Sequence, residues 1–235
     1  MKNTINKTLV FAMFFLPFQA EAAGEDDPLL TMITIDQLEK RDASSGKPFA
    51  WEIQGWAGYD LDKLVFKTEG ERANGETEKA ELQLLYSKAI DPYWDLQFGI
   101  RHDFYPKPTQ DWAVIAVQGV APYYFETDAS LFIGEDGQTA LRLESEYEMM
   151  LTQQWVLSPE IEVNFHGKND EVREVGSGLS NIEAGLRLRY EVRREIAPYI
   201  GIHWEKKFGD TADFAREEGE DTNDTQLVIG IRIWF

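Results

Sequence analysis

The chain has 235 residues, no cysteine and a formal net charge of −19, with 42 acidic and 23 basic side chains. This acidity argues against nucleic acid as a partner, because phosphate backbones repel carboxylates, and it is compatible with attraction of cations. No stretch approaches the roughly 20 continuous apolar residues that a transmembrane helix requires.

The first segment, Met1–Ala22, has the features of a secretory signal peptide. Two lysines precede the apolar run Leu9–Phe18, and Ala20-Glu21-Ala22 fits the small-residue rule for cleavage. The run is too short to cross a membrane as a helix, so a retained anchor is the less favoured alternative. An exported chain of this kind is either a soluble periplasmic domain or a transmembrane barrel.

Behind a short acidic segment, residues 23–29, the remainder of the chain (30–235) alternates apolar and polar residues in stretches separated by turn-forming residues. A period of two predicts β-strands. The segments expected to form strands are Leu30–Arg41, Phe49–Tyr59, Lys63–Arg72, Thr77–Lys88, Tyr93–Tyr105, Gln110–Ala121, Phe125–Gly134, Thr139–Met150, Gln154–Gly167, Leu179–Val192, Tyr199–Phe208 and Thr225–Phe235.

The last of these segments shows the pattern most clearly. From Leu227 to Phe235 every second residue is apolar, whereas Gln226, Gly230 and Arg232 occupy alternate positions. A terminal strand that ends on an aromatic residue, behind an export signal, is typical of an outer-membrane β-barrel.

We therefore predict an all-β fold, a single antiparallel transmembrane β-barrel of about 12 strands, or 10 if Leu30–Arg41 stays outside the sheet. Strands of about ten residues match a bilayer when tilted. A soluble lipocalin-like barrel would turn its apolar face inward, but here the opposite face is dense in charge, which is costly to bury. Short turns alternate with longer polar loops, the longest being the acidic loop Gly209–Asp224. An even strand number places both termini in the periplasm.

Many charged side chains share the parity that faces the lumen, and we expect them to neutralise one another across strands. If they fill the lumen the barrel is closed, and if they line a gap they form a narrow polar pore. These residues are Lys67, Glu69, Arg142, Glu144, Glu146, Glu162, Glu183, Arg187, Arg189 and Arg232.

Histidine offers the first candidate metal ligands, because imidazole with carboxylate suits Cu(II). Parity places His166 and His203 on the lumen side of their strands and His102 on the apolar side, as an interfacial residue. His203 and Glu205 are two residues apart on one face. They form either a copper-binding pair or an ordinary polar contact within the charge network.

Thioethers, which suit Cu(I), are the second class of candidate ligand. Met150 is expected to point inward with Glu148, and Met149 to face lipid; both are alternatively apolar filler beside a turn. A copper path through sulfur would require Met150, Met32 and a lumen histidine to converge. The candidate metal ligands are therefore His203, Glu205, Met150, His166 and Met32.

Five blocks carry a resemblance to a known family, and together the likeness extends from about Met32 to Phe235. The blocks are Trp51–Glu71, Trp112–Glu126, Thr139–Val156, Gly176–Arg194, and Ala197–Glu205 with Lys207-Phe208-Gly209. They resemble the copper resistance protein B family. The resemblance implies an outer-membrane barrel, encoded with periplasmic copper-handling proteins, that lowers copper stress.

One departure from that family concerns the segment before the barrel. Members often carry a Met- and His-rich stretch there, whereas residues 23–29 contain neither residue. We expect this chain to lack a metal-capturing tail at that position.

Three functions compete at this point. The first is a copper-binding or copper-conducting protein of the outer membrane that contacts copper ions, periplasmic copper-handling proteins and lipid. The second is a membrane-boundary lipase, which requires a serine activated by histidine. No serine lies two residues from any of the three histidines, so we expect no enzyme activity. The third is a structural or small-solute barrel without metal specificity.

Overall fold

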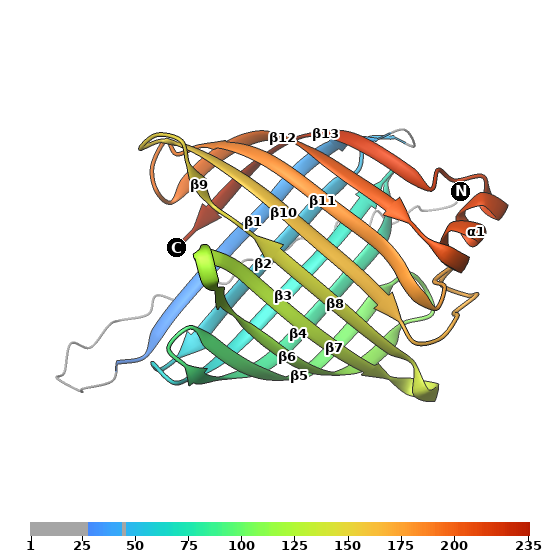
Figure 1. Cartoon of the computed structure of the whole chain (residues 1–235), viewed down its shortest axis with the longest axis horizontal. Helices are drawn as coiled ribbons and strands as arrows, with labels where there is room; N and C mark the ends of the chain where they lie inside the picture. The colour runs from blue at the N-terminus through green and yellow to red at the C-terminus, as the bar shows by residue number, and fades with distance from the viewer. Residues whose placement is uncertain (1–27, 44–45) are drawn as a thin grey trace, which may run out of the picture.

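The computed structural model describes residues 28–43 and 46–235, which form an antiparallel β-barrel (Figure 1). The predicted signal peptide and nearly all of segment 23–29 lie outside the described residues. The strands are β1 (Leu30–Asp42), β2 (Phe49–Gly58), β3 (Asp62–Ala73), β4 (Glu76–Asp91), β5 (Trp94–Tyr105), β6 (Gln110–Ala121), β7 (Phe125–Gly134), β8 (Thr139–Glu146), β9 (Met149–Met150), β10 (Trp155–His166), β11 (Gly178–Tyr190), β12 (Ile196–Lys207) and β13 (Asn223–Trp234).

Three helical segments connect the strands, and none of the helices in the described part of the chain is long and apolar enough to cross a membrane. They are the short 3-10 helices η1 (Pro122–Tyr124) and η2 (Glu135–Gly137) and the α-helix α1 (Gly209–Glu218).

The barrel closes through its first and last strands. In β1 and β13, Thr34 lies opposite Trp234, and the Phe235 amide donates to the Ile33 carbonyl at 2.9 Å. Each strand pairs with its sequence neighbour, and β8 and β9 both pair with β10, so that together they form one interrupted strand of the barrel wall. With β8 and β9 counted as one, the described residues form a barrel of twelve strands. The prediction of a twelve-stranded barrel that includes residues 30–41 is confirmed.

The outer surface of the barrel is apolar, as the alternating pattern predicts. Strand residues of the apolar parity are exposed, a surface too large and continuous to face water and suited to lipid. They include Leu82, Leu84, Phe98, Ile100, Ile115, Leu131, Ile133, Leu143, Ile161, Leu186, Ile200, Ile202, Leu227 and Ile229. Exposed aromatic residues lie near the strand ends, at positions where such side chains anchor barrels at the membrane interface.

The inner surface differs from the prediction because one side of it is apolar. Leu85, Val114 and Phe132 are almost completely buried, and they pack with Val65, Trp112 and Ala116 into a cluster inside β3, β4, β6 and β7. The charged residues of these strands indicate a polar interior, but other inward-facing positions on the same strands are apolar. This cluster fills part of the lumen and confines the polar network to the remainder.

Two local elements also differ from the sequence-based expectation. The eighth strand is interrupted at residues 147–148, which separate β8 from β9. The acidic loop Gly209–Asp224 contains α1, whose small residues Ala212 and Ala215 are buried. The helix ends at Gly219, which adopts the left-handed conformation (φ 82°) that glycine reaches without a Cβ penalty.

The two ends of the barrel are unlike (Figure 1). One end, here called the turn end, carries the C-terminus and short connections such as 59–61, 92–93 and 151–154. The other, the loop end, carries the segment 167–177 and the segment 208–222 with α1.

Gly230 is expected to be essential for this packing. A Cβ at position 230 would lie 2.6 Å from the Tyr199 ring and 2.7 Å from Glu39 Cβ. Overpacking of this kind costs about 1–3 kcal/mol, so Gly230→Ala should lower the free energy of unfolding in a urea titration of the barrel refolded into lipid vesicles. The loss should shrink when Tyr199→Ala is added, and an equal loss in both backgrounds would contradict the clash.

Candidate functional site

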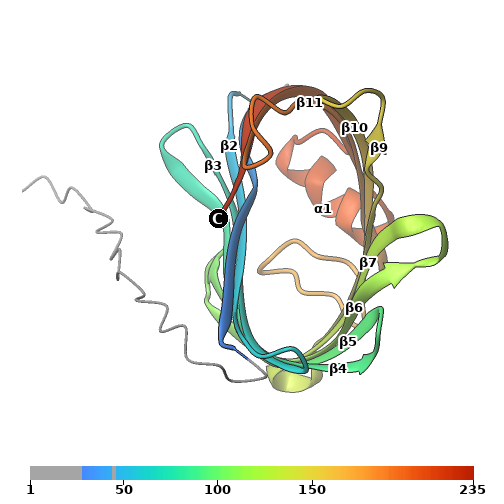
Figure 2. The same ribbon diagram turned by 90° about the vertical axis from the view of Figure 1, so that its left-hand side faces the viewer.

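The lumen is flattened, so opposite walls of the barrel approach one another. Figure 2 shows an elongated cross-section with β2 and β3 on one long wall and β7 and β10 on the other. Polar contacts cross the gap: Lys67 of β3 donates to Asp128 of β7 at 2.6 Å, and Gln37 of β1 donates to Glu160 of β10 at 3.4 Å. The polar interior is therefore a set of bridges between walls.

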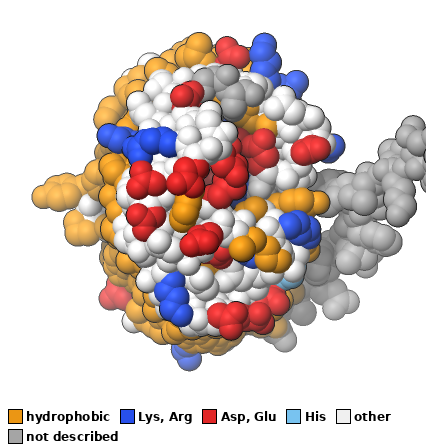
Figure 3. Space-filling view, turned by 90° about the vertical axis from the view of Figure 1, so that its right-hand side faces the viewer, with side chains coloured by type: hydrophobic (Ala, Val, Ile, Leu, Met, Phe, Trp, Pro, Cys, Tyr) orange, Lys and Arg blue, Asp and Glu red, His pale blue; other side chains and the backbone are white. Residues whose placement is uncertain are grey.

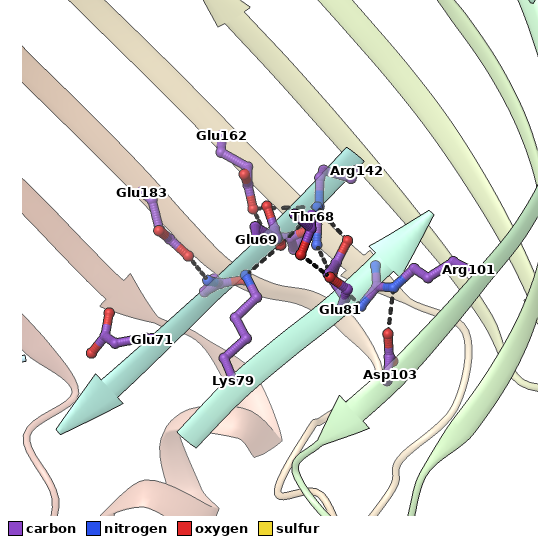
Figure 4. A network of polar contacts seen from close by, with 12 residues as sticks. Thr68, Glu69, Glu71, Lys79, Glu81, Arg101, Asp103, Arg142, Glu162 and Glu183 are labelled. Atoms are coloured by element: carbon purple, nitrogen blue, oxygen red, sulfur yellow. Dashed lines mark hydrogen bonds and ion pairs between the residues drawn. The ribbon is translucent and has the colours of Figure 1, made fainter. Parts of the chain in front are cut away.

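Arg142 of β8 is the centre of the largest bridge (Figure 4). Its guanidinium lies 3.0 Å from Glu69 of β3 and 3.2 Å from Glu81 of β4, on the far wall. Arg101 lies 2.7 Å from the same Glu81, and Lys79 lies 2.8 Å from Glu69. The almost completely buried Glu81 thus has two cationic partners, which offset the cost of removing its charge from water.

Glu39 organises a second cluster beside the closing strands. Both of its oxygens accept from Arg187 of β11 at 3.0 Å, and Tyr199 and Arg41 donate to it at 2.8 Å. Paired, bidentate geometry of this kind is the strong form of a buried ion pair. Tyr199 and Glu39 of this cluster also pack against Gly230 of β13. Glu39 is on β1 opposite Gly230, so the cluster lies where the first and last strands close the barrel.

A third cluster lies toward the turn end. Arg232 of β13 donates to Asp36 of β1 at 3.0 Å and to Glu148, which also accepts from Arg189. The predicted inward orientation of Arg189 and Arg232 agrees with these contacts.

Two cavities lie among these clusters. The turn-side cavity, of about 240 Å³, is bordered by Asp36, Lys67, Arg142, Arg189 and Arg232. The loop-side cavity, of about 250 Å³, is bordered by only two cationic side chains, Arg41 and Lys79. Its carboxylates are Glu52, Glu69, Glu71, Glu78, Glu144, Glu160, Glu162, Glu183 and Glu205. Glu69, Glu71, Glu160 and Glu162 are paired with arginine or lysine. The excess of negative charge is therefore carried by the carboxylates without a cationic partner among the described residues, and in a confined space it favours entry of cations.

His203 and Glu205 both line the loop-side cavity. His203 is only 3% exposed, and its Nε2 lies 3.5 Å from Glu183 Oε2 on the neighbouring strand β11. Its Nδ1 has no hydrogen-bond partner among the described residues. Glu183 and Glu205 are directly opposite each other in the β11–β12 ladder. One imidazole and two carboxylates thus share one wall of an anionic cavity.

The other candidate ligands lie elsewhere. His166 donates to or accepts from Ser180 at 2.8 Å, and it borders neither cavity. Met150 is 60% exposed and pairs with Val156 next to the turn 151–154. Met150 is paired with Val156, Val156 with Arg189, and Arg189 with Tyr199 of β12, so Met150 is level with Tyr199. His203 is four residues further along β12, so it is displaced from that level by roughly 13 Å along the strand, at about 3.3 Å per residue.

Met32 also lies toward the turn end, opposite Trp56 and close to the register of Thr34 with Trp234. The structure therefore brings His203 and Glu205 together and leaves the methionines apart from them. Within the described residues, no group of three His, Asp or Glu side chains forms a ready coordination sphere for a metal ion.

Sequence reasoning did not connect Glu71 and Lys79 with His203. They come from β3 and β4, whereas His203 is on β12, and only closure of the barrel brings these strands around one cavity. The parity of Glu71 was a usable signal for its inward orientation, but no sequence pattern gives the register across a lumen.

The loop end of the barrel is covered by two segments. In Figure 2, 167–177 and α1 lie within the outline of the barrel, and Figure 3 shows acidic side chains gathered over this end. Arg173 is largely buried and lies 3.4 Å from Asp103 of β5, and the Gly176 amide donates to Thr211 of α1 at 2.8 Å. Burial and a hydrogen bond to Glu218 raise the pKa of the loop carboxyl Glu174. We call these two segments the lid.

Neutralising the central arginine is expected to destabilise the barrel strongly. Arg142→Met leaves Glu69 and Glu81 without their cross-lumen partner, and breaking a buried pair from one side costs about 3–5 kcal/mol. Urea unfolding in vesicles measures the loss. The matched control is Arg216→Ala, whose ion pair with Asp213 is exposed at 61% and 65%, and which should change stability by less than about 0.5 kcal/mol.

Releasing Arg173 is expected to loosen the lid. Arg173→Ala removes the contact with Asp103, and proteinase K should then cut within 167–177 about tenfold faster, because local opening is favoured by roughly 1.4 kcal/mol. Arg193→Ala, at the turn end, is the control and should leave that rate unchanged. Equal cleavage rates in wild type and Arg173→Ala would show that other contacts hold the segment.

Solved barrels resemble this fold. The NanC porin has a TM-score of 0.57 at 11% sequence identity, covering 86% of this chain and 98% of that one. The KdgM porin has a TM-score of 0.51 at 9% identity, covering 87% and 99%. At these identities the likeness concerns the fold alone, a porin-like β-barrel.

Sequence comparison is more specific. Residues 29–235 match the family described as "Copper resistance protein B precursor (CopB)", and a precursor agrees with the predicted signal peptide. The Copper resistance protein B homolog of Pseudomonas syringae pv. tomato (strain ATCC BAA-871 / DC3000) is 47% identical over 210 residues, 89% of this chain and 71% of the relative. Copper resistance protein B of Escherichia coli is 45% identical over 213 residues, 91% and 72%. The chain therefore belongs to the copper resistance protein B family.

Proposed function

We propose that this protein lowers copper stress by binding copper ions in the lumen of an outer-membrane barrel and conducting them across the membrane, without catalysing a reaction. The observation that carries the proposal is the placement of His203 and Glu205 in one anionic cavity, within a chain of this family. Imidazole and carboxylate are ligands that suit Cu(II).

The electrostatics of the loop-side cavity support a cationic cargo. Its carboxylates outnumber its cationic side chains, Arg41 and Lys79. Rings of acidic side chains are the usual means by which pores favour cations over anions. A copper ion that enters would find one imidazole and the Glu183 and Glu205 carboxylates within the same wall.

The proposed orientation places the turn end and both termini in the periplasm. Short turns on the periplasmic side and longer loops outside are the usual arrangement of such barrels, and the signal peptide agrees with insertion from the periplasm. Periplasmic copper-handling proteins would then exchange copper at the turn end, while the apolar belt contacts outer-membrane lipid.

A second candidate function is a structural or small-solute barrel without metal specificity. It is favoured by one observation, the dense pairing around Arg142, because a lumen filled by ion pairs needs no cargo to be stable. The two functions differ in whether His203 matters for copper.

Replacing His203 is expected to weaken copper binding. His203→Ala removes the one imidazole of the loop-side cavity, so the affinity of the refolded mature barrel for Cu(II), measured by equilibrium titration, should fall at least about tenfold. The control is His102→Ala: His102 pairs with Asp111 at 2.6 Å beside Phe104, near the strand end, away from both cavities.

Copper tolerance of cells gives the second measurement. A strain that lacks its own copy should be rescued by wild type and His102→Ala and rescued less by His203→Ala. Equal Cu(II) affinity in all three proteins would refute the His203 site and favour the barrel without metal specificity.

A further inference from the structure

The two cavities of the lumen meet at a shared border. Both are lined by Glu52 of β2 and Glu144 of β8, a pair we call the junction. The remaining shared residues are Gln37, Glu69 and Glu160. Anything that passes between the His203 cavity and the turn-side cavity therefore passes these side chains.

Opposite walls of the barrel supply the junction. In the twelve-stranded barrel, β2 and β8 are six strands apart and so lie on opposite walls. The flattened cross-section brings these walls together (Figure 2). On the same or neighbouring strands, Arg142 reaches Glu69, Lys67 reaches Asp128, and Gln37 reaches Glu160. Each of these bridges joins a donor to an acceptor, whereas the junction sets one carboxylate against another.

The junction carboxylates differ from their neighbours in pairing. Glu69 is held by Arg142 and Lys79, and Glu160 by Arg187. The side-chain carboxylates of Glu52 and Glu144, unlike their backbone groups, have no hydrogen bond or ion pair with any residue that the structure describes. The charged side chains that act most strongly on Glu52 are carboxylates, with Glu144 first. Those that act most strongly on Glu144 are Glu162 and Asp128, followed by the cation Lys67.

Unpartnered ligand atoms lie on both sides of the junction. On the loop side, His203 is 3% exposed and its Nδ1 has no partner; on the turn side, Gln83 is 6% exposed and its Oε1 has none. Buried polar atoms are almost always paired. Gln97, Ser158 and Gln226 also carry buried atoms without a partner, but these residues line neither cavity. His203 and Gln83 line the two cavities that share Glu52 and Glu144, and a cationic ligand there would act on all four side chains.

We propose that Glu52 and Glu144 bind a second divalent cation, through oxygen ligands, at the border between the two cavities. A bound cation removes the repulsion between two confined carboxylates and gives each an opposite charge. The inference rests on the proposed function, which supplies copper as the cation that reaches the lumen. The proposed site is a second binding site that a copper ion would occupy in addition to the His203 site on its way through the lumen.

The donor chemistry of the two sites separates them. Carboxylates and a glutamine oxygen are hard ligands that also accept Ca²⁺ and Mn²⁺, with water completing the coordination sphere. Imidazole at His203 favours copper over those ions. A copper-preferring site followed by a less selective one suits conduction, because an ion must bind in order to enter and must also leave.

The experiment uses the refolded mature barrel, titrated with Cu(II) and examined by pulsed electron paramagnetic resonance. The variants are His203→Ala and the double variant Glu52→Gln with Glu144→Gln, which keeps side-chain size. Glu126→Gln is the matched control, since Glu126 lines only the turn-side cavity and has no ion pair among the described residues. Heat-modifiable migration on gels verifies that each variant is folded.

Wild type should bind one Cu(II) with nitrogen coupling and a second without it, and excess Ca²⁺ should displace only the second. The double variant should weaken the second site at least about tenfold and keep the first, while Glu126→Gln keeps both. His203→Ala should lose the nitrogen-coupled ion alone.

Two results would overturn the inference while leaving the proposed function intact: a wild type with only the nitrogen-coupled ion, or a double variant that keeps both ions. Failure of His203→Ala to change any copper signal would instead count against the proposed function. The two ideas therefore fail separately.

Discussion

Ion pairs that cross a narrow lumen hold the two long walls of this barrel together. An apolar outer surface leaves most charged strand residues on the inside, where burial makes a single unpaired charge costly. Arg142 with Glu69 and Glu81, and Arg187 with Glu39, answer that constraint. The flattened cross-section follows, because the pairs span the gap only where opposite walls are close.

The same constraint explains what the sequence could and could not predict. Alternation assigned the inward face of β12, so the lumen position of His203 and Glu205 was predictable from parity alone. Neighbouring strands could be expected to pair in order, and closure between β1 and β13 followed from a barrel. Contacts across the lumen, such as Arg142 with Glu69, depend on curvature and shear, which no local pattern encodes.

Other misses have local causes. Phe132 and Leu85 are on the inward parity, but alternation identifies only the dense charge of that face and does not show that its apolar members gather into one cluster. The helix α1 was not predicted because it lies in an acidic stretch with few apolar residues. Only Thr211, Ala212 and Ala215 of the helix are buried. Its position depends on the contact with 167–177, a tertiary interaction that sequence periodicity does not register.

The balance of charges in the lumen determines which carboxylates can bind a ligand. Where a carboxylate meets an arginine, as at Glu39, the lumen is stable without a ligand and that carboxylate is not free to bind one. Only carboxylates without such a partner remain available to a cation, and those of the loop-side cavity line it together with His203. The acidic side chains of the lumen therefore have two roles: those paired with arginine or lysine hold the barrel together, and under the proposed function the unpaired ones attract the cation. The described methionines, Met32, Met149 and Met150, lie toward the turn end, so the described part of the lumen offers nitrogen and oxygen, the ligand class that suits Cu(II).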